Sequence, residues 1–300
     1  MKNIKIYLLI VLYIVTVIFP FPANAQSLSL SLTPPITQIM IKPGKTISQN
    51  YTLINNGDES IIRIGLKTLD KNGQPSQAQK NDITWLNIVS PVSTDNPLLL
   101  KKGEKLEIII SISPPVDTEQ QDYYHAISIA TVALPGNQSR SDVSAELLSP
   151  ILLAVTESGL AKKAEITEFA LPKLIDSFDG IKTDLTVKNT GQTYFYLNGQ
   201  LLLKGNYLQA KFPVIPRIYL INQQKKIQLS ESDKNKLKGF FIGKYTLTAD
   251  FVFDEGNIKL TENKVFYALP WKLLLAMVLI TLIIIILNVK IPFNKDKSAK

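Results

Sequence analysis

The sequence predicts an all-β protein, with two tandem Ig-like antiparallel β-sandwiches followed by one transmembrane α-helix. Apolar and polar residues alternate through the middle of the chain, and the clearest run is Leu106, Ile108, Ile110 and Ile112. A period of two places such side chains on one face of a half-buried strand. Turn signals rich in Gly and Asn separate the runs, while uncharged apolar segments stand near both ends. Many short strands between turns indicate sandwiches, and the terminal segments indicate export and membrane anchoring.

Residues 1–25 have the features of a secretory signal peptide. The basic residues Lys2 and Lys5 precede an uncharged apolar segment at 6–19, and an A-x-A motif follows at 23–25. A retained membrane anchor is the alternative, although the apolar segment is short for a span and two prolines follow it directly. We therefore expect cleavage before Gln26.

Residues 269–291 are predicted to form the transmembrane helix. Their uncharged centre at 273–289 covers about 26 Å at about 1.5 Å per residue. Lys272 and Lys290 flank this centre, and Trp271 stands where an aromatic belt belongs. A buried core helix is the alternative, but no polar face interrupts the segment. The short basic tail at 292–300 predicts a cytoplasmic C-terminus, which places residues 26–268 outside the cell membrane.

The net charge of +8 mostly reflects these topology signals. The signal peptide and the segment from Lys272 onward carry most of the excess lysine, so the charge gives little support to nucleic-acid binding. Residues 26–157 hold ten basic and thirteen acidic residues, whereas residues 158–271 hold sixteen basic and eleven acidic ones. The basic second part favours an anionic wall polymer, and an ordinary solvated surface explains it equally well.

The segment between the signal and the span is long enough for two sandwich domains, since each needs about 100 residues. We place the first at 26–157 and the second at 158–268, with a short hinge at 157–159. The apolar run at 151–155 suits a last strand that is covered on both faces. The segments 48–57 and 182–191 align, each with alternating apolar residues before N-x-G, as a repeated strand or chance would produce. The best candidate for a short helix is 230–237.

The residue types exclude several kinds of site. The chain has no Cys, which excludes a disulfide framework, a thiolate metal site and a Cys nucleophile, and its single His125 excludes a multi-His metal site. A Ser-His-Asp triad would need His125, and no G-x-S-x-G motif accompanies it. We expect a packed or solvated strand histidine, and a protein without enzyme activity, cofactor or metal.

Three further motifs are less specific. Asp70 and Asn72 mimic the start of a calcium loop, but its twelfth position is Asn81 instead of Glu, so we predict a hairpin turn. Sequons occur at 50–52 and 137–139. Paired carboxylates of a glycoside hydrolase are not recognisable from spacing, so an extracytoplasmic hydrolase stays as an alternative.

Adjacent aromatic residues are the best candidates for a recognition surface. Tyr123 and Tyr124 face opposite sides of a strand, and Tyr194, Phe195 and Tyr196 raise the same expectation. The alternative is that the outward rings cover a seam between the two domains.

Residues 31–73 contain Pro34 or Pro35, followed by PG at 43–44, NNGD at 55–58 and DKNG at 70–73. These motifs and their order resemble the opening of the WxL-interacting surface proteins of Gram-positive bacteria. The layout of signal peptide, two sandwiches, one span and a basic tail is also similar, whereas a Gly-rich segment of the family is absent between Asp82 and Ser139. The resemblance implies a first module that contacts peptidoglycan and a second that contacts partner surface proteins or host proteins.

The expected function is that of a membrane-anchored extracytoplasmic binding or adaptor protein at the cell surface. Its expected partners are the membrane, peptidoglycan or another wall polymer, and secreted or surface proteins, and its binding residues are not assigned. One alternative is a membrane-tethered chaperone or assembly factor, which would show an unpaired hydrophobic edge strand. The hydrolase alternative requires a concave cluster of carboxylates.

Overall fold

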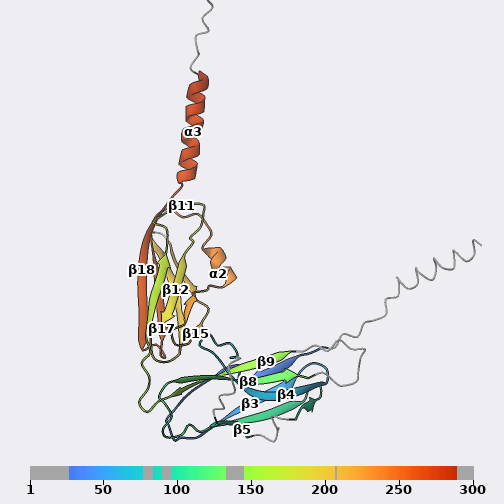
Figure 1. The fold of residues 1–300 in the computed structure, drawn as a ribbon. Helices are drawn as coiled ribbons and strands as arrows, with labels where there is room; N and C mark the ends of the chain where they lie inside the picture. Colours follow the sequence, from blue (N-terminus) through green and yellow to red (C-terminus); the bar gives the residue numbers. More distant parts are fainter. Residues whose placement is uncertain (1–26, 77–83, 90–95, 133–144, 207, 289–300) are drawn as a thin grey trace, which may run out of the picture.

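The computed structural model describes residues 27–76, 84–89, 96–132, 145–206 and 208–288. The predicted signal peptide, the basic tail, Asn81 and the second sequon lie outside these residues. Two groups of strands follow one another along the chain, and a long helix leaves the second group at its far end (Figure 1).

The first sandwich pairs a four-stranded sheet, in the order β1-β3-β7-β5, with a five-stranded sheet, in the order β2-β9-β8-β4-β6. Its strands are β1 (Leu30–Thr33), β2 (Thr37–Ile41), β3 (Ile47–Asn55), β4 (Ser60–Thr68), β5 (Leu86–Ile88), β6 (Leu98–Leu100), β7 (Lys105–Ile112), β8 (Asp122–Thr131) and β9 (Glu146–Val155).

The second sandwich pairs a three-stranded sheet, in the order β10-β12-β16, with a longer sheet, in the order β11-β18-β17-β13-β14, and β15 also pairs with β13. The elements are β10 (Ala164–Ala170), β11 (Leu174–Asp176), β12 (Asp184–Asn189), β13 (Phe195–Gly205), β14 (Gln209–Pro213), β15 (Arg217–Tyr219), β16 (Gln224–Lys226), α2 (Glu231–Lys236), β17 (Gly243–Phe253) and β18 (Ile258–Leu269).

The all-β fold class is confirmed, and the alternation in the sequence is the reason for it. In β7 the side chains of Ile108, Ile110 and Ile112 are fully buried, while the residues between them are partly exposed. β9 lies where the last strand of the first sandwich is predicted, and its end is buried on both faces. The short helix is also confirmed as α2, and the Ser230 hydroxyl caps it by accepting from the amide of Asp233.

Two strand pairs depart from the expected antiparallel arrangement. β2 pairs with β9 in parallel, and β11 pairs with β18 in parallel. In both cases the chain leaves one sheet and joins the edge of the other: β1 to β2 passes through Pro34 and Pro35, and β10 to β11 passes through Pro172. Prolines suit these crossings because they donate no ladder hydrogen bond.

A buried asparagine closes the end of the first sandwich. The side-chain amide of Asn55 donates to the carbonyl oxygens of Asp58 (2.8 Å) and Leu100 (3.0 Å), while its side-chain oxygen accepts from the amide of Gly57 (3.0 Å). Asn55 is fully buried. Both hydrogens and the oxygen of this side-chain amide are therefore used. The bond to Leu100 links the end of β3 to a segment 45 residues later in the sequence.

Asn189 repeats this arrangement in the second sandwich. Its side-chain amide donates to the carbonyl oxygens of Thr193 (2.9 Å) and Tyr219 (3.0 Å), and its side-chain oxygen accepts from the amide of Gly191 (2.8 Å). A Cβ at Gly191 would lie 2.6 Å from the carbonyl oxygen of Ala161, so only Gly fits. The aligned segments of the sequence therefore have the same local structure, as a repeated strand entering a turn predicts.

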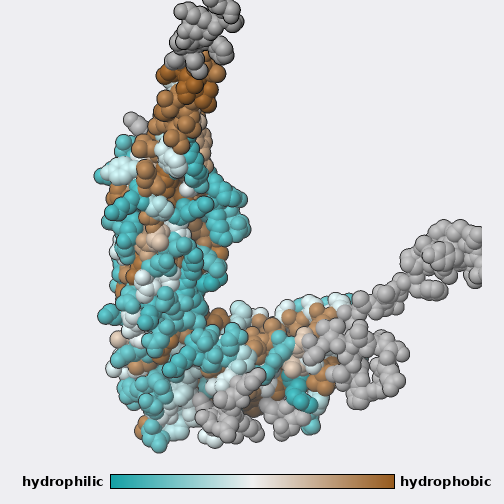
Figure 2. All heavy atoms as spheres, turned by 45° about the horizontal axis from the view of Figure 1, so that its top comes forward, coloured by the Kyte–Doolittle hydropathy of each residue, from teal (hydrophilic) through white to brown (hydrophobic). Residues whose placement is uncertain are grey.

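Helix α3 (Trp271–Asn288) follows the second sandwich. Its 18 residues span about 27 Å, and none of them is buried against the rest of the described chain. The polar side chains of Thr281 and Asn288 donate to carbonyl oxygens four residues earlier, at 2.8 Å. The helix is thus long and apolar enough to cross a membrane, and Figure 2 shows it as a uniformly hydrophobic column above more polar sandwiches.

The start of this helix differs from the predicted boundary at residue 269. Leu269 belongs to β18, and the helix begins at Trp271. The reason is Pro270, which holds the preceding residue in an extended conformation and is well tolerated at the beginning of a helix.

A carboxylate binds the two sandwiches together. Asp122, at the start of β8, accepts hydrogen bonds from the hydroxyl of Thr193 (2.8 Å), the amide of Tyr194 (2.7 Å) and the hydroxyl of Tyr124 (2.7 Å). Thr193 and Tyr194 belong to the second sandwich. Burial outweighs these bonds and raises the pKa of Asp122.

Apolar side chains surround this carboxylate and form what we call the seam. The Tyr194 hydroxyl crosses it to donate to the carbonyl oxygen of Leu152 in β9 (3.1 Å). The predicted hinge is held nearby, because the side-chain oxygen of Gln120 accepts from the amide of Glu157 (3.0 Å). The buried apolar residues of the seam are Leu69, Tyr124, Ala126, Leu152, Ala154, Tyr194 and Leu220.

Asn55→Ala is expected to destabilise the first sandwich by about 3 kcal/mol, because the carbonyl oxygens of Asp58 and Leu100 and the amide of Gly57 lose their partner. Thermal or denaturant unfolding measures this change. Asn56→Ala is the matched control, since Asn56 is exposed and its side chain makes one hydrogen bond, to Ser31. Equal losses of stability in the two variants would contradict the role of Asn55.

Asp122→Ala is expected to loosen the seam, since each buried donor left without a partner costs about 1–3 kcal/mol. Because the chain has no Cys, nitroxide labels at Val116→Cys and Lys211→Cys report the distance between the sandwiches directly. The distance distribution should broaden in Asp122→Ala and keep its width in the exposed control Asp117→Ala. A width unchanged in both would show that Asp122 does not hold the seam.

Candidate partner-binding groove

The residues singled out by the sequence take mostly structural roles. His125 is buried in β8, its Nε2 has no hydrogen-bond partner among the described residues, and burial lowers its pKa to about 4. The imidazole is therefore neutral at pH 7, which is the environment of a packed strand histidine. Asp70 Oδ1 accepts from the amides of Asn72 and Gln74, both at 2.8 Å, so this motif forms the predicted turn. These backbone bonds lower the pKa of Asp70.

Some of the adjacent aromatic residues lie between the two domains, as the alternative expectation from the sequence predicts. Tyr124 and Tyr194 lie in the seam, and burial together with the nearby Asp122 raises the pKa of both hydroxyls. Phe195 is in the core of the second sandwich, where its ring stacks on those of Tyr219 and Phe253. Tyr196 alone of the Tyr194–Tyr196 run is exposed. Within the described ranges, no group of three or more His, Asp or Glu residues has the arrangement of a metal site.

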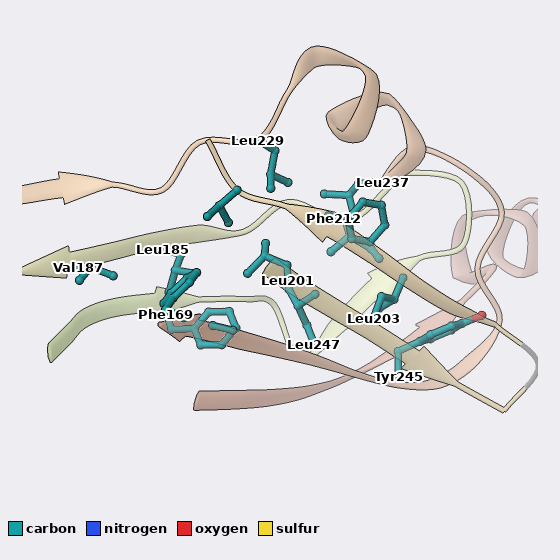
Figure 3. Close-up of a cluster of buried hydrophobic side chains, with 14 of the residues drawn as sticks. Phe169, Leu185, Val187, Leu201, Leu203, Phe212, Leu229, Leu237, Tyr245 and Leu247 are labelled. Atoms are coloured by element: carbon teal, nitrogen blue, oxygen red, sulfur yellow. The ribbon is translucent and has the colours of Figure 1, made fainter. Parts of the chain in front are cut away.

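A groove that sequence analysis did not find opens on the second sandwich. It lies where the short sheet ends and the longer sheet continues. It is bordered by the end of β10, the start of β12, the α2 region and β18, and its volume is about 1380 Å³. Figure 3 shows core side chains of the second sandwich, with Phe169, Leu185 and Leu201 coming from the two sheets and Leu229 and Leu237 from the segments before and after α2. Its apolar floor is made by Phe169, Ile181, Leu185, Leu201, Leu229 and Leu237, all of which are buried.

An unpaired strand edge borders the groove. β18 pairs with β17 from Ile258 to Ala268 on one side, but on its other side β11 covers only Tyr267 to Leu269. No backbone hydrogen bond from the described chain reaches this outer side between Ile258 and Phe266. The edge therefore offers the ladder positions of one further strand.

The register identifies which backbone groups face outward. The amide of Tyr267 donates outward, to the carbonyl oxygen of Lys173 at 2.9 Å. Because the N–H and C=O of one residue point to the same side and the direction alternates, Val265, Asn263 and Thr261 also face outward. Asn263 and Val265 line the groove, so the free backbone groups and the apolar floor belong to one surface.

Charged side chains occupy the inner face of this edge. Phe266 and Ala268 point into the core, and the same parity places Lys264 and Glu262 on the inner side, where they pair at 3.0 Å. Lys264 Nζ also lies 5.8 Å from the ring centre of Phe169. Inward-facing charges on an exposed edge are a known protection against indiscriminate strand pairing.

The rim of the groove is basic. Five lysines line it, and Asp184 is its single carboxylate in the part of the chain that the structure describes. Asp184 is paired with Lys226, and Lys234 is paired with Glu231 outside the groove. Lys173 and Lys182 have no ion-pair partner among the residues described. The rim lysines are Lys173, Lys182, Lys226, Lys234 and Lys264.

Comparisons with known proteins give structural similarity only. No family model matches the chain, and no curated protein matches it. A solved structure of the class 5 fimbriae chaperone CfaA covers 79% of this chain and 99% of its own, at 11% identity and a TM-score of 0.41. The E. coli chaperone DraB covers 82% and 100%, at 12% identity and a TM-score of 0.38. The Pseudomonas aeruginosa chaperone CupB2 covers 78% and 99%, at 9% identity and a TM-score of 0.37.

The burial of His125 makes stability depend on pH. The pKa of its imidazole falls from 6.5 in the unfolded chain to about 4 in the fold. The contribution of His125 to stability is therefore fully present above pH 6.5 and is lost as the pH falls toward 4. Between pH 7 and pH 5 this amounts to about 2 kcal/mol. His125→Leu should remove that part of the pH dependence, as measured by denaturant unfolding at both pH values. The same loss in wild type and variant would assign the pH dependence to other groups.

Proposed function

We propose that this protein is a membrane-anchored extracytoplasmic protein that captures an extended segment of a partner protein at the β18 edge. The observation that carries the proposal is the unpaired edge of β18 directly above an apolar groove. The outward amides and carbonyls bind the backbone of an added strand, and the groove receives its alternate side chains.

The chemistry of the groove defines the segment that fits. Alternate apolar side chains complete the contacts of the floor around Leu201 and Leu229. Acidic side chains next to them pair with the rim lysines Lys173 and Lys182, which have no ion-pair partner among the described residues. The proposed ligand is therefore an extended segment in which apolar and acidic residues alternate.

The anchoring part of the proposal combines α3 with the ends of the sequence. The signal-like residues 1–25 and the lysine-rich residues after the span favour an external location for both sandwiches, with the C-terminus in the cytoplasm. A captured segment would then be held outside the cell membrane and close to it.

Of the three hypotheses from the sequence, the membrane-tethered chaperone or assembly factor gains the most support. Its expected sign is an unpaired hydrophobic edge strand, whereas a closed, charged edge counts against it. The β18 edge is open and borders an apolar groove, and it also carries the charged pair of Glu262 and Lys264. The adaptor hypothesis also requires capture of a partner protein. It differs from the chaperone hypothesis in what happens to that partner after capture. Binding of peptidoglycan by the first sandwich, which the family resemblance implies, stays a prediction.

Asn263→Pro tests the proposal. Its amide faces outward, so proline removes a donor that an added strand needs and leaves the pairing with β17 intact. The full-length protein in lipid nanodiscs is titrated with a fluorescent ten-residue peptide of alternating Val and Glu. We expect Asn263→Pro to weaken binding about ten-fold or more, since lost hydrogen bonds and a steric block each cost about 1 kcal/mol or more.

Asn263→Ala is the matched control, because it keeps the amide and should bind as wild type does. A peptide of alternating Val and Lys should bind neither variant. Equal binding of the acidic peptide by the Pro and Ala variants, or no binding by wild type, would refute capture at β18. If Asn263→Pro instead abolishes self-association of the chain, the edge belongs to a homodimer.

A further inference from the structure

Exposed apolar side chains gather at the end of the second sandwich from which α3 leaves. Phe178 is 61% exposed, Phe240 and Ile242 are each 56% exposed, Leu269 is 45% exposed and Trp271 is 44% exposed. We call these five residues the collar. They come from three separate segments, namely the turn after β11, the loop after α2 and the junction of β18 with α3.

Backbone hydrogen bonds bring these segments together. The amide of Ser177 donates to the carbonyl oxygen of Leu269 (3.1 Å), and the amide of Phe241 donates to the carbonyl oxygen of Ser177 (3.0 Å). The rings of Phe178 and Phe240 pack with their centres 5.1 Å apart. The collar is therefore a built surface, and its rings are exposed because the fold directs them outward.

Two carboxylates fix the collar to the first turn of α3. Asp176 accepts from the amide of Lys272 (3.0 Å) and from the amide of Phe178 (3.1 Å), and these bonds lower its pKa. Asp179 accepts from Lys272 Nζ with both oxygens, at 2.6 and 2.7 Å. A carboxylate at the amide end of a helix is favourable, so the helix start and the collar are held as one unit.

Lysines lie near the collar along the chain. Lys244 stands opposite Tyr267 in the β17–β18 ladder, and Tyr267 is two residues before Leu269 of the collar. Lys238 adjoins Gly180, just beyond Asp179. Aromatic rings with lysines around them match the interface of a bilayer, where rings sit at headgroup level and ammonium groups meet phosphates.

From this arrangement we infer that the collar docks into the interfacial layer of the same bilayer that α3 crosses. The inference rests on the membrane anchoring proposed above. The occupant is lipid because the collar lies where α3 leaves the sandwich and is continuous with the exposed apolar surface of that helix. Docking holds the second sandwich at a set orientation, with the groove residue Val265 about 14 Å along β18 from Leu269.

Site-directed spin labelling of the full chain in nanodiscs tests this inference, and the absence of native Cys makes single labels simple. A nitroxide at Phe240→Cys should lose contact with a water-soluble nickel complex and gain contact with oxygen, relative to a label at the exposed, distant Val116→Cys. Adding Phe178→Ser to the Phe240→Cys protein should shift the label back toward water.

A label at Leu279→Cys separates the two proposals. If this label is shielded from nickel while the label at residue 240 is as accessible as the one at residue 116, the span stands and the collar inference is overturned. If the label at residue 279 is itself accessible to nickel, the membrane anchoring fails and the collar inference fails with it. Shielding at both residue 240 and residue 279 supports the collar.

Discussion

The side-chain amide of a buried asparagine, present once in each sandwich, is the interaction on which the rest of the structure depends. Asn55 and Asn189 each join the end of a long strand to a connection far away in the sequence, using both amide hydrogens and the side-chain oxygen. Without these asparagines, water would bind the same carbonyl oxygens at the end of each sandwich, and the two sheets would not be linked there. Because both amides are saturated, each sandwich has one register at this end, and the seam can be built from rigid surfaces.

The seam holds the two sandwiches together through hydrogen bonds and apolar contacts. Its carboxyl group, Asp122, lies beside buried rings and receives donors from both sandwiches, so relative rotation of the sandwiches would break the hydrogen bonds from Thr193 and Tyr194. The adjacent apolar contacts explain why the end of β9 is buried on both faces. The hinge expected at 157–159 is thus a fixed corner, in keeping with the angular arrangement of the two sandwiches in Figure 1.

Much of the fold could be predicted from the sequence, because it depends on local patterns. The alternation in β7 and β17, the double burial of β9, the α2 helix and the apolar α3 all follow from residue spacing. The groove could not be predicted, since it arises from the unequal lengths of two sheets that meet in three dimensions. One signal was present in β18: Ile258, Leu260 and Phe266 share a parity that Glu262 and Lys264 interrupt. Charges at core-facing positions mark an edge, but only the sheet order shows that the edge is open.

The continuity of β18 with α3 has a mechanical consequence. The strand that offers the open edge runs without a loop into the apolar helix, with only Pro270 between them. Under the proposed function, a partner chain paired along this strand and pulled away from the bilayer would load its ladder in shear, so that all the inter-strand bonds share the force instead of breaking one after another. The direction of β18 would therefore make the grip strongest against tension along the membrane normal.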